Sequence, residues 1–500
     1  MPTSPAEPAE PAEPAESAES AEPAAAAYDI AVLGAGPAGL SAATAAAAHG
    51  ARVALLDAAP RPGGQYWRHR PADDGAAHHD WPLFQRLRTA AHTHRARLDH
   101  LPGHAVWHIE RTATGFVTHA LSDGAPREVL SRTVVVATGA YDRQLPFPGW
   151  TLPGVYTAGG AQALLKGHGV VAGRRIVVAG TGPFLLPVAS GMAEAGATVL
   201  GVFEAGRPTA FARRPLTTLR AAVKLAEAAH YLRTLRRHGV PYRSRTTVVE
   251  AHGADSVTGA VVARLDDRWR IVPGTRRRLE CDTVAVGYGF TPQTEIPAQL
   301  GCAMDRDADG SLVARVDTRQ RSTVPGVYVA GEACGVGGAG LARTEGELAG
   351  LHAAYATTGV RPDPHGVARL LRLRAARRGF AAALHAAYPV RPGWREWLTE
   401  DTVVCRCEEV TAGAIRHAVR ELGATDPRAV KLCARPGMGL CQGRVCGYAT
   451  AALTAAHAGR EVTEEDLRGL ASRPIAQPVP LGLLRDPRSG TMPHHDEESQ

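Results

Sequence analysis

Residues 28–57 decide the fold: YDIAVLGAGPAGLSAATAAAAHGARVALLD. This stretch predicts a buried strand at Tyr28–Leu33, an alanine-rich helix at Ala38–His49 and a second strand at Arg52–Leu56. Between the first strand and the helix stands Gly34-Ala35-Gly36-Pro37-Ala38-Gly39. Asp57 follows the second strand, where we expect it to accept ribose hydroxyls. A lone glycine turn is a weak signal, but these parts in this order predict a dinucleotide site.

Each residue of the turn has a physical role in such a site. Gly34 allows the tight turn, Gly36 lets the backbone approach a pyrophosphate, and Gly39 lets the helix pack closely on the strand. The first helical turn, with Pro37 and Ala38, presents unpaired N–H groups and the positive end of the helix dipole to the phosphates.

The composition is that of a globular protein. With 500 residues, 45% of them apolar and 21% charged, the chain should form about two to four domains. Residues 1–27 are a Pro/Ala/Glu tract with six glutamates, no lysine or arginine, and no secretory signal, so we expect disorder there. Five of the eight cysteines fall within 42 residues, which favours a metal centre in a reducing compartment, so we expect a cytoplasmic location. The formal charge of +7 becomes +13 without that tract, but the arginines are not interleaved with aromatics. We therefore expect anionic cofactors or an acidic partner, and neither nucleic acid nor a transmembrane segment.

Three further motifs indicate that the first cofactor is FAD. They are Arg61-Pro62-Gly63-Gly64-Gln65, Val134-Val135-Val136-Ala137-Thr138-Gly139-Ala140 and Val327-Tyr328-Val329-Ala330-Gly331-Glu332. They resemble the motifs of glutathione-reductase-like flavoproteins, in which the last motif ends in Gly-Asp and binds the flavin ribityl chain. This chain has Glu332 at the position of that aspartate, so the resemblance implies the same carboxylate acceptor on a longer side chain. Glycines up to Gly340 form either a surface loop or the start of a helix at Leu341–Tyr355, whose amides would stabilise negative charge on the flavin.

A second βαβ unit is predicted downstream. A strand at Arg175–Ala179 precedes Gly180-Thr181-Gly182-Pro183-Phe184-Leu185, and a later strand ends at Glu204. Leu185 replaces the third glycine, which we expect to move helix and strand slightly apart. Glu204 favours NAD or another adenine nucleotide over NADP, and nearby arginines weaken this preference. The alternative is a nucleotide-type fold that holds no nucleotide.

Four of the eight cysteines form two pairs near the C-terminus, a C-x-C pair and a C-x4-C pair: Cys405, Cys407, Cys441 and Cys446. Thr411 is the expected N-cap of a helix at Ala412–Leu422 that brings the pairs together. Four thiolates suit an iron–sulfur cluster or zinc, although zinc sites usually use C-x2-C pairs. Gly437 leaves room for a backbone N–H group to approach a cluster sulfur. Cys433 lies outside both pairs, and we expect it to be a core thiol.

The cysteine segment resembles the bacterioferritin-associated-ferredoxin-type domain, which implies a 2Fe-2S cluster on these four cysteines. The motifs GAGPAGL, RPGGQ, GEACGVGGAG, CRCEEVT and GMGLCQGRVCG together resemble one family of electron-transferring flavoprotein subunits. Its members are the A (or alpha) subunits of opine oxidases, the B subunits of hydrogen cyanide synthases, and the alpha subunits of bacterial proline and hydroxyproline dehydrogenases. The resemblance implies two partners: a second, amine-oxidising flavoprotein and a small 2Fe-2S protein.

The fold expected is α/β, with two dinucleotide-binding, glutathione-reductase-like domains, a discontinuous FAD domain and a small, mainly helical 2Fe-2S domain. The chain is expected to return to the FAD domain near Cys281–Gly287. The expected segments are the leader 1–27, FAD domain 28–150 and 281–358, inserted nucleotide domain 151–280, connector 359–400, 2Fe-2S domain 401–472, and C-terminal segment 473–500.

The expected function is relay of electrons from oxidation of an amino acid or an opine-type secondary amine. The alternatives are a stand-alone NADH-dependent reductase and a non-catalytic electron-transfer or assembly subunit. A disulfide reductase is excluded, because it needs a cysteine pair beside the flavin and no cysteine precedes Cys281. No residue is assigned as a catalytic base.

Overall fold

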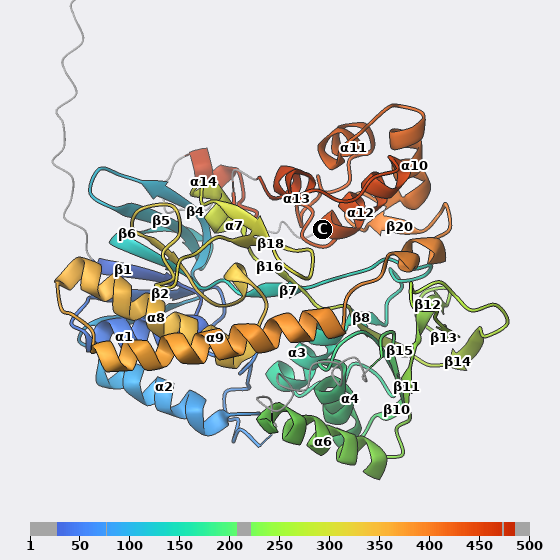
Figure 1. Cartoon of the computed structure of the whole chain (residues 1–500), viewed down its shortest axis with the longest axis horizontal. Helices are drawn as coiled ribbons and strands as arrows, with labels where there is room; N and C mark the ends of the chain where they lie inside the picture. Colours follow the sequence, from blue (N-terminus) through green and yellow to red (C-terminus); the bar gives the residue numbers. More distant parts are fainter. Residues whose placement is uncertain (1–27, 77, 208–221, 473–474, 486–500) are drawn as a thin grey trace, which may run out of the picture.

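The computed structural model describes residues 28–76, 78–207, 222–472 and 475–485. The expected disordered leader, 1–27, and the acidic tail, 486–500, lie outside the described residues. Two sheets flanked by helices form the body of the molecule, and a group of short helices from the C-terminal part of the chain lies beside them (Figure 1).

The first sheet is built around the strand that precedes the glycine motif. Its strands are β1 (Tyr28–Leu33), β2 (Val53–Asp57), β3 (Leu98–Pro102), β4 (Ala105–Arg111), β5 (Phe116–Ser122), β6 (Ala125–Val136) and β19 (Val327–Val329). Their order is β3-β2-β1-β6-β5-β4, and β19 pairs with the end of β6. The parallel strands β1, β2 and β6 bury apolar side chains such as Val32, Leu55 and Val135, as expected where both faces are covered.

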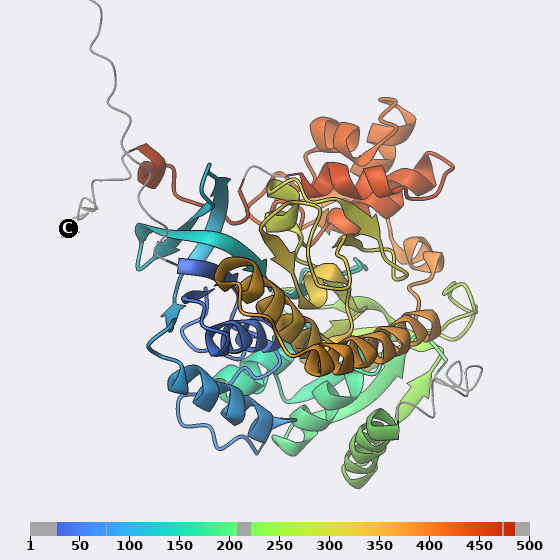
Figure 2. The same cartoon turned by 60° about the vertical axis from the view of Figure 1, so that its left-hand side comes forward.

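Helices α1 (Pro37–Ala48) and α8 (Gly338–Thr358) lie side by side on this sheet, and α2 (Trp81–Thr93) packs next to α1 (Figure 2). Small residues let the two helices touch. A β-carbon added to Gly346 would overlap the carbonyl group of Ala38, and one added to Gly350 would overlap that of Ala42. The expected late helix is therefore present as α8, although it begins three residues earlier than predicted.

The second sheet is parallel throughout. Its strands are β8 (Val155–Thr157), β9 (Arg175–Gly180), β10 (Thr198–Glu204), β11 (Tyr242–Ser244) and β15 (Thr283–Gly287), in the order β11-β10-β9-β15-β8. The helices of this region are α3 (Ala158–His168), α4 (Leu185–Glu194) and α6 (Ala222–Arg237). An antiparallel sheet adjoins it, made of β12 (Thr246–His252), β13 (Gly259–Arg264) and β14 (Arg277–Glu280).

The expected return of the chain to the FAD domain near Cys281–Gly287 is wrong for β15, which lies between β9 and β8 in the second sheet. The residue pattern of a short apolar strand does not indicate which parallel sheet the strand joins, so the sequence could not assign β15 to either sheet. The return comes later, through a series of short elements. They are β16 (Phe290–Pro292), which pairs with β7 (Ala140–Asp142), then α7 (Glu295–Gln299), β17 (Met304–Arg306), β18 (Leu312–Ala314) and β19.

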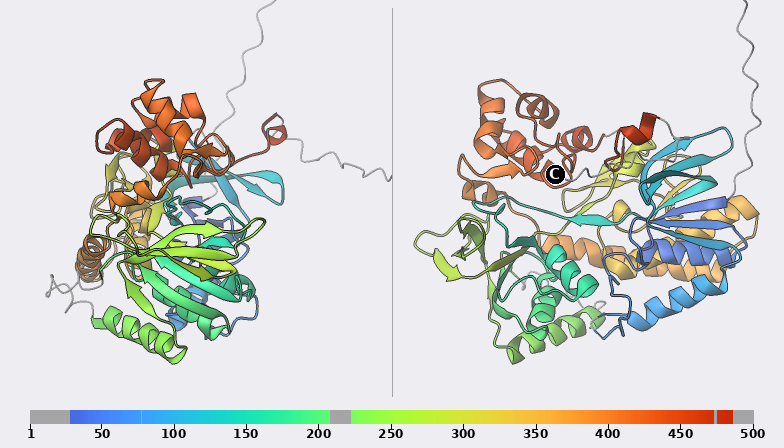
Figure 3. Two further views of the ribbon diagram at one scale, coloured as in Figure 1. Left: turned by 90° about the vertical axis from the view of Figure 1, so that its right-hand side faces the viewer. Right: turned by 180° about the vertical axis from the view of Figure 1, so that it is seen from behind.

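The C-terminal part of the chain is mainly helical, as expected. Helix α9 (Pro364–Ala387) is capped by Asp363, runs along α8 and leads to the 3-10 helix η3 (Pro392–Trp397). The small region then contains β20 (Val403–Cys405), β21 (Val410–Thr411), α10 (Ala412–Arg420), α11 (Pro427–Ala434), α12 (Gly447–His457) and α13 (Glu464–Ala471). It lies on one side of the two-sheet body (Figure 3). The last helix, α14 (Gly482–Arg485), lies apart from this region, near β4 and β5 (Figure 1). Within the described ranges, no helix has both the length and the apolar character needed to cross a bilayer.

The close approach of α1 and α8 yields a stability prediction. Gly350→Ala should lower the free energy of unfolding by about 1–3 kcal/mol, because the added methyl group must displace backbone atoms of Ala42. Gly379→Ala on α9 is the matched control: no atom lies within 4 Å of its added β-carbon, and helix propensity should give a gain of about 0.5–1 kcal/mol. Urea unfolding followed by circular dichroism measures both, and equal effects would contradict the packing argument.

Candidate functional site

The first glycine turn has the shape that a bound pyrophosphate needs. Gly34 has φ +102°, and a β-carbon there would lie 2.5 Å from the carbonyl oxygen of Ala137. A β-carbon on Gly39 would overlap the carbonyl of Gly34. Gly36 differs, because the nearest atom to its added β-carbon is the Cα of Gly64, at 3.8 Å. The packing of the protein itself therefore requires glycine at positions 34 and 39, whereas Gly36 leaves open space at the N-terminus of α1.

The Arg61–Gln65 motif packs against this turn. The N–H of Gly63 donates to the carbonyl oxygen of Ala35 at 2.8 Å, whereas Gln65 is exposed. Asp57, at the end of β2, accepts from the N–H groups of Ala35 at 2.5 Å and Ala59 at 2.6 Å. Burial raises the pKa of Asp57, and these N–H groups oppose that rise. Each carboxylate oxygen keeps a lone pair for a ribose hydroxyl, so that role stays a prediction.

Thr138 and Gly139 join the first sheet to the segment that returns from the second. The Thr138 hydroxyl donates to the carbonyl oxygen of Gln293 at 3.0 Å, and the N–H of Gln293 donates to the carbonyl oxygen of Gly139 at 2.9 Å. Gly139 has φ +82°, in the region that favours glycine. These residues therefore position strands β7 and β16, which lie next to them on the two chain segments.

Glu332 lies on the 3-10 helix η2 (Gly331–Cys334), directly before α8. Gly331 has φ +76°, and a β-carbon there would lie 3.0 Å from the β-carbon of Ala38, so this turn rests on α1. Burial raises the pKa of Glu332 to about 7. The backbone N–H of Gly338 lowers this pKa, and the nearby charge of Asp142 raises it. The first glycine turn, Glu332 and the start of α8 thus come together, as a flavin site requires.

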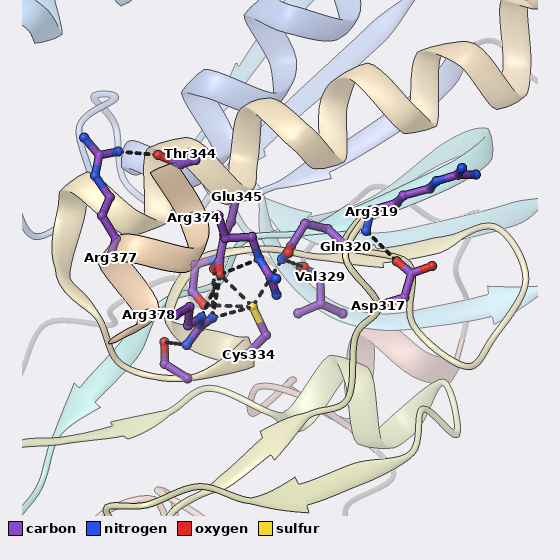
Figure 4. Close-up of polar contacts among 12 residues, drawn as sticks. Asp317, Arg319, Gln320, Val329, Cys334, Thr344, Glu345, Arg374, Arg377 and Arg378 are labelled. Atoms are coloured by element: carbon purple, nitrogen blue, oxygen red, sulfur yellow. Dashed lines mark hydrogen bonds and ion pairs between the residues drawn. The ribbon is translucent and has the colours of Figure 1, made fainter. Parts of the chain in front are cut away.

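A buried ion-pair network that sequence reasoning missed holds this turn in place (Figure 4). Glu345, on α8, is fully buried and accepts from Arg378 at 2.8 and 2.9 Å and from Arg374 at 3.2 Å. Its carboxylate also accepts from the backbone N–H of Gly331 at 3.3 Å and from the thiol of Cys334 at 3.4 Å. The network joins α8, α9 and η2, and its members come from segments that no local motif connects.

Glu204 stabilises the second glycine turn from within. Its side chain is fully buried, and its carboxylate accepts from the Thr181 hydroxyl at 2.8 Å, the Gly182 N–H at 2.8 Å and the Gly206 N–H at 2.6 Å. Burial raises the pKa of Glu204 to about 7 against these three donors. In this conformation the carboxylate of Glu204 is closed off from solvent, whereas that of Asp57 is partly exposed, and a ribose contact at Glu204 stays a prediction.

The second turn also differs from the first in where its helix begins. Helix α4 begins at Leu185, three residues after Gly182, whereas α1 begins directly after Gly36. The space at Gly182 is open, and Gly180 is tight because a β-carbon there would overlap the carbonyl of Gly287. Binding of NAD or another adenine nucleotide at Gly180 and Gly182 therefore stays a prediction.

The four predicted cysteine ligands come together as two pairs of thiols. The thiol of Cys405 is hydrogen-bonded with that of Cys446, and the thiol of Cys407 with that of Cys441. The pKa of Cys405 is lowered to about 5, chiefly by the hydrogen bond with the Cys446 thiol and also by the N–H of Gly437, which donates to the Cys405 sulfur at 3.4 Å. Among the described residues, no three His, Cys, Asp or Glu side chains surround a single ion position. Two adjacent thiol pairs suit the two irons of a 2Fe-2S centre.

The helix between the pairs forms as predicted, but Cys433 does not behave as predicted. The Thr411 side chain accepts from the N–H of Ala414 and caps α10, which begins at Ala412. Cys433 is exposed on α11, so the expectation of a core thiol is wrong. Helix α11 turns Val430 into the core and leaves Leu432 and Cys433 outside, a placement that depends on how this short helix docks.

One cavity joins the cysteines to strand β7, strand β8 of the second sheet and the segment between these strands. It has a volume of about 180 Å³ and is lined by all four predicted ligands and by Asp142, Trp150 and Thr157. Asp142 accepts from the Thr157 hydroxyl at 2.6 Å, and its charge also acts on Glu332. Sequence reasoning missed Asp142, although it lies only three residues after the Thr138-Gly139 motif.

Two known families match separate parts of the chain. Residues 28–357 match the pyridine nucleotide-disulphide oxidoreductase family, and residues 403–455 match the BFD-like [2Fe-2S] binding domain. The first match contains both glycine turns and Glu332, and the second contains all four cysteines. The cofactors are therefore FAD and a 2Fe-2S cluster, and zinc is not supported.

The chain is similar to known proteins over nearly its whole length. It is 36% identical over 477 residues to the opine oxidase A subunit of Rhizobium meliloti strain 1021, covering 92% of this chain and 98% of that protein. It is 34% identical over 465 residues to the hydrogen cyanide synthase subunit HcnB of Pseudomonas aeruginosa, covering 91% and 98%. Its fold resembles that of L-proline dehydrogenase from P. horikoshii, with a TM-score of 0.66 at 21% identity, covering 91% of this chain and 79% of that one.

The assignment of cysteines predicts different effects of two substitutions. Cys441→Ser should lose most of the about two irons per chain, because it removes one of four thiolate ligands. Cys433→Ser, a control on an exposed cysteine of the same region, should keep them. Iron analysis and the visible spectrum after anaerobic purification measure the loss, and flavin content should stay unchanged in both. A variant Cys441→Ser with full iron content would refute the assignment.

The buried carboxyl of Glu204 predicts a pH-dependent stability. Its pKa is 4.5 unperturbed and about 7 in the folded chain, so the folded state holds this proton more tightly and loses stability as pH rises between these values. Glu204→Gln cannot ionise. Relative to this variant, the wild type should lose about 3 kcal/mol between pH 4 and pH 8. Urea unfolding of both proteins across that range measures the difference, and a constant difference would contradict the prediction.

Proposed function

Since the chain belongs to the pyridine nucleotide-disulphide oxidoreductase family and is an FAD- and 2Fe-2S-containing relative of the opine oxidase A subunit, we propose that it relays electrons released when an amino acid or opine-type secondary amine is oxidised. The observation that carries this proposal is the cavity shared by Asp142 and the four cysteines, because the charge of Asp142 also acts on Glu332 of the expected flavin site. FAD, when bound, accepts electrons in pairs and releases them singly, and a 2Fe-2S cluster takes one at a time.

The residues of this chain supply the surroundings for such a relay. The N-terminus of α8 offers its dipole and N–H groups to negative charge on a reduced flavin. Glu332 would bind the ribityl chain, and Asp57 the adenosine ribose. On the other side, Cys405, Cys407, Cys441 and Cys446 would hold the cluster. The Gly437 N–H supports this by donating to the sulfur of Cys405.

We place the oxidation of the amine itself in a second, amine-oxidising flavoprotein, with a small 2Fe-2S protein as a further partner. The support is that the similar proteins are named as subunits, one of opine oxidase and one of hydrogen cyanide synthase. A cytoplasmic location belongs to the same proposal, because a reducing compartment keeps cysteine ligands as thiols. The full burial of Glu204 favours this placement over a stand-alone NADH-dependent reductase, because a ribose contact there would need a change of conformation.

The test is anaerobic reduction of the purified holoprotein, alone and with its co-purified partner flavoprotein. With octopine, nopaline, proline, hydroxyproline, sarcosine or glycine, the flavin should stay oxidised until the partner is added. One of these amines should then bleach it and reduce the cluster. Bleaching by NADH alone would replace this proposal with the reductase function. Bleaching by an amine without the partner would place amine oxidation in this chain.

A further inference from the structure

Two reciprocal arginine–tyrosine contacts join strand β7 to the cluster region. The guanidinium of Arg143, just after β7, lies 4.6 Å from the ring centre of Tyr448 on α12. The second contact runs from the cluster region to β7. Arg444 lies between the last two cysteine ligands in the sequence, and its guanidinium is 6.0 Å from the ring centre of Tyr141 on β7. Cation–π contacts of this kind are stronger when desolvated. Arg143 meets that condition, because its side chain is only 2% exposed.

Arg444 makes a further contact that crosses the same boundary. Its Nε lies 2.9 Å from the carboxylate of Glu295 on α7, and each side chain is only 9% exposed. The same guanidinium donates to the carbonyl oxygen of Cys441 at 3.1 Å and to that of Ala476. Arg444 therefore ties the loop that holds Cys441 and Cys446 to the segment returning toward the FAD domain. Removing one partner of such a buried pair leaves an uncompensated charge.

The segment on the other side of these contacts belongs to the flavin site. Residues 138–143 run from the Thr138-Gly139 motif through Tyr141 and Asp142 to Arg143. Asp142 lies near Glu332 on one side and lines the cysteine cavity on the other. These six consecutive residues thus begin in the expected flavin motif, line the cavity through Asp142 and contact the cluster loop through Tyr141.

We propose that the Glu295–Arg444 ion pair is a positioning contact that fixes the 2Fe-2S site against the flavin domain and so sets the rate of electron transfer between them. This rests on the relay function proposed above. The step moves one electron from reduced FAD to the oxidised cluster. The second electron follows after an external one-electron acceptor has reoxidised the cluster, and the proton taken up with the pair is released to water.

The test compares Glu295→Gln with Glu400→Gln in the full-length holoprotein. Glu400 pairs with Arg416 at 2.9 Å, but both side chains are about half exposed and both residues belong to the C-terminal region, before β20 and on α10. The flavin is reduced by a light pulse with deazaflavin, and the reduced cluster is detected by rapid freeze-quench EPR spectroscopy. Transfer should slow about tenfold or more in Glu295→Gln and stay at the wild-type rate in Glu400→Gln. Iron and flavin contents should match the wild type in both variants.

Measuring the reduction potential of the cluster separates an effect of cluster position on the transfer rate from an effect of driving force. Glu295→Gln removes a negative charge near the cluster, so its potential should rise and the driving force for transfer should increase. Slower transfer at a raised potential would therefore come from geometry. The exchanged pair, Glu295→Arg with Arg444→Glu, should recover part of the lost rate because the ion pair is restored.

Each outcome bears on one proposal. Electron transfer at the wild-type rate in Glu295→Gln would overturn the positioning role and leave the relay function intact. A wild-type protein in which a reduced flavin never reduces its cluster would overturn the relay function itself. Loss of iron in Glu295→Gln with no recovery in the exchanged pair would also overturn the positioning role, because the contact would then serve cluster retention.

Discussion

The backbone contact between α1 and α8 is the constraint on which the flavin side depends. Glycines on α8 face alanine carbonyls on α1, so the two helices lie closer than larger side chains would allow. This distance brings the start of α8, with Glu332 just before it, over the first glycine turn. Two stretches separated by about 300 residues therefore form one site only because the residues at the contact are small.

Buried carboxylates are used for two different purposes in this molecule. Glu345 is matched by Arg374 and Arg378 and joins α8, α9 and the turn at Gly331. Glu204 is held by neutral donors of its own turn, and burial raises its pKa. The ion pairs of Glu345 stabilise the turn at Gly331, which belongs to the expected flavin site. The carboxylate of Glu204 instead accepts hydrogen bonds from the turn that it stabilises. The acid of the first glycine turn, Asp57, also accepts from backbone N–H groups, so the two turns differ mainly in how deeply this carboxylate is buried.

The parts of the site that could be predicted are those fixed by local backbone demands. Gly34 needs a positive φ, Gly39 has no room for a β-carbon, and Thr411 caps its helix within three residues, so residue type alone identifies them. Contacts such as Arg143 with Tyr448 depend on how distant segments dock, and no spacing pattern records that. The same limit explains β15, whose sheet could not be told from its apolar residues, and Cys433, whose exposure depends on the docking of α11.

The pairing of β19 with β6 also has a consequence for the order in which the chain is made. All five strands of the second sheet have been synthesised once residue 287 is complete, although Trp394 and Trp397, which pack into its core, come later. The first sheet begins earlier but lacks β19 until residue 329 and α8 until residue 358. During synthesis, the helix layer that α1 begins on the first sheet therefore stays incomplete until the inserted domain and then α8 have been made.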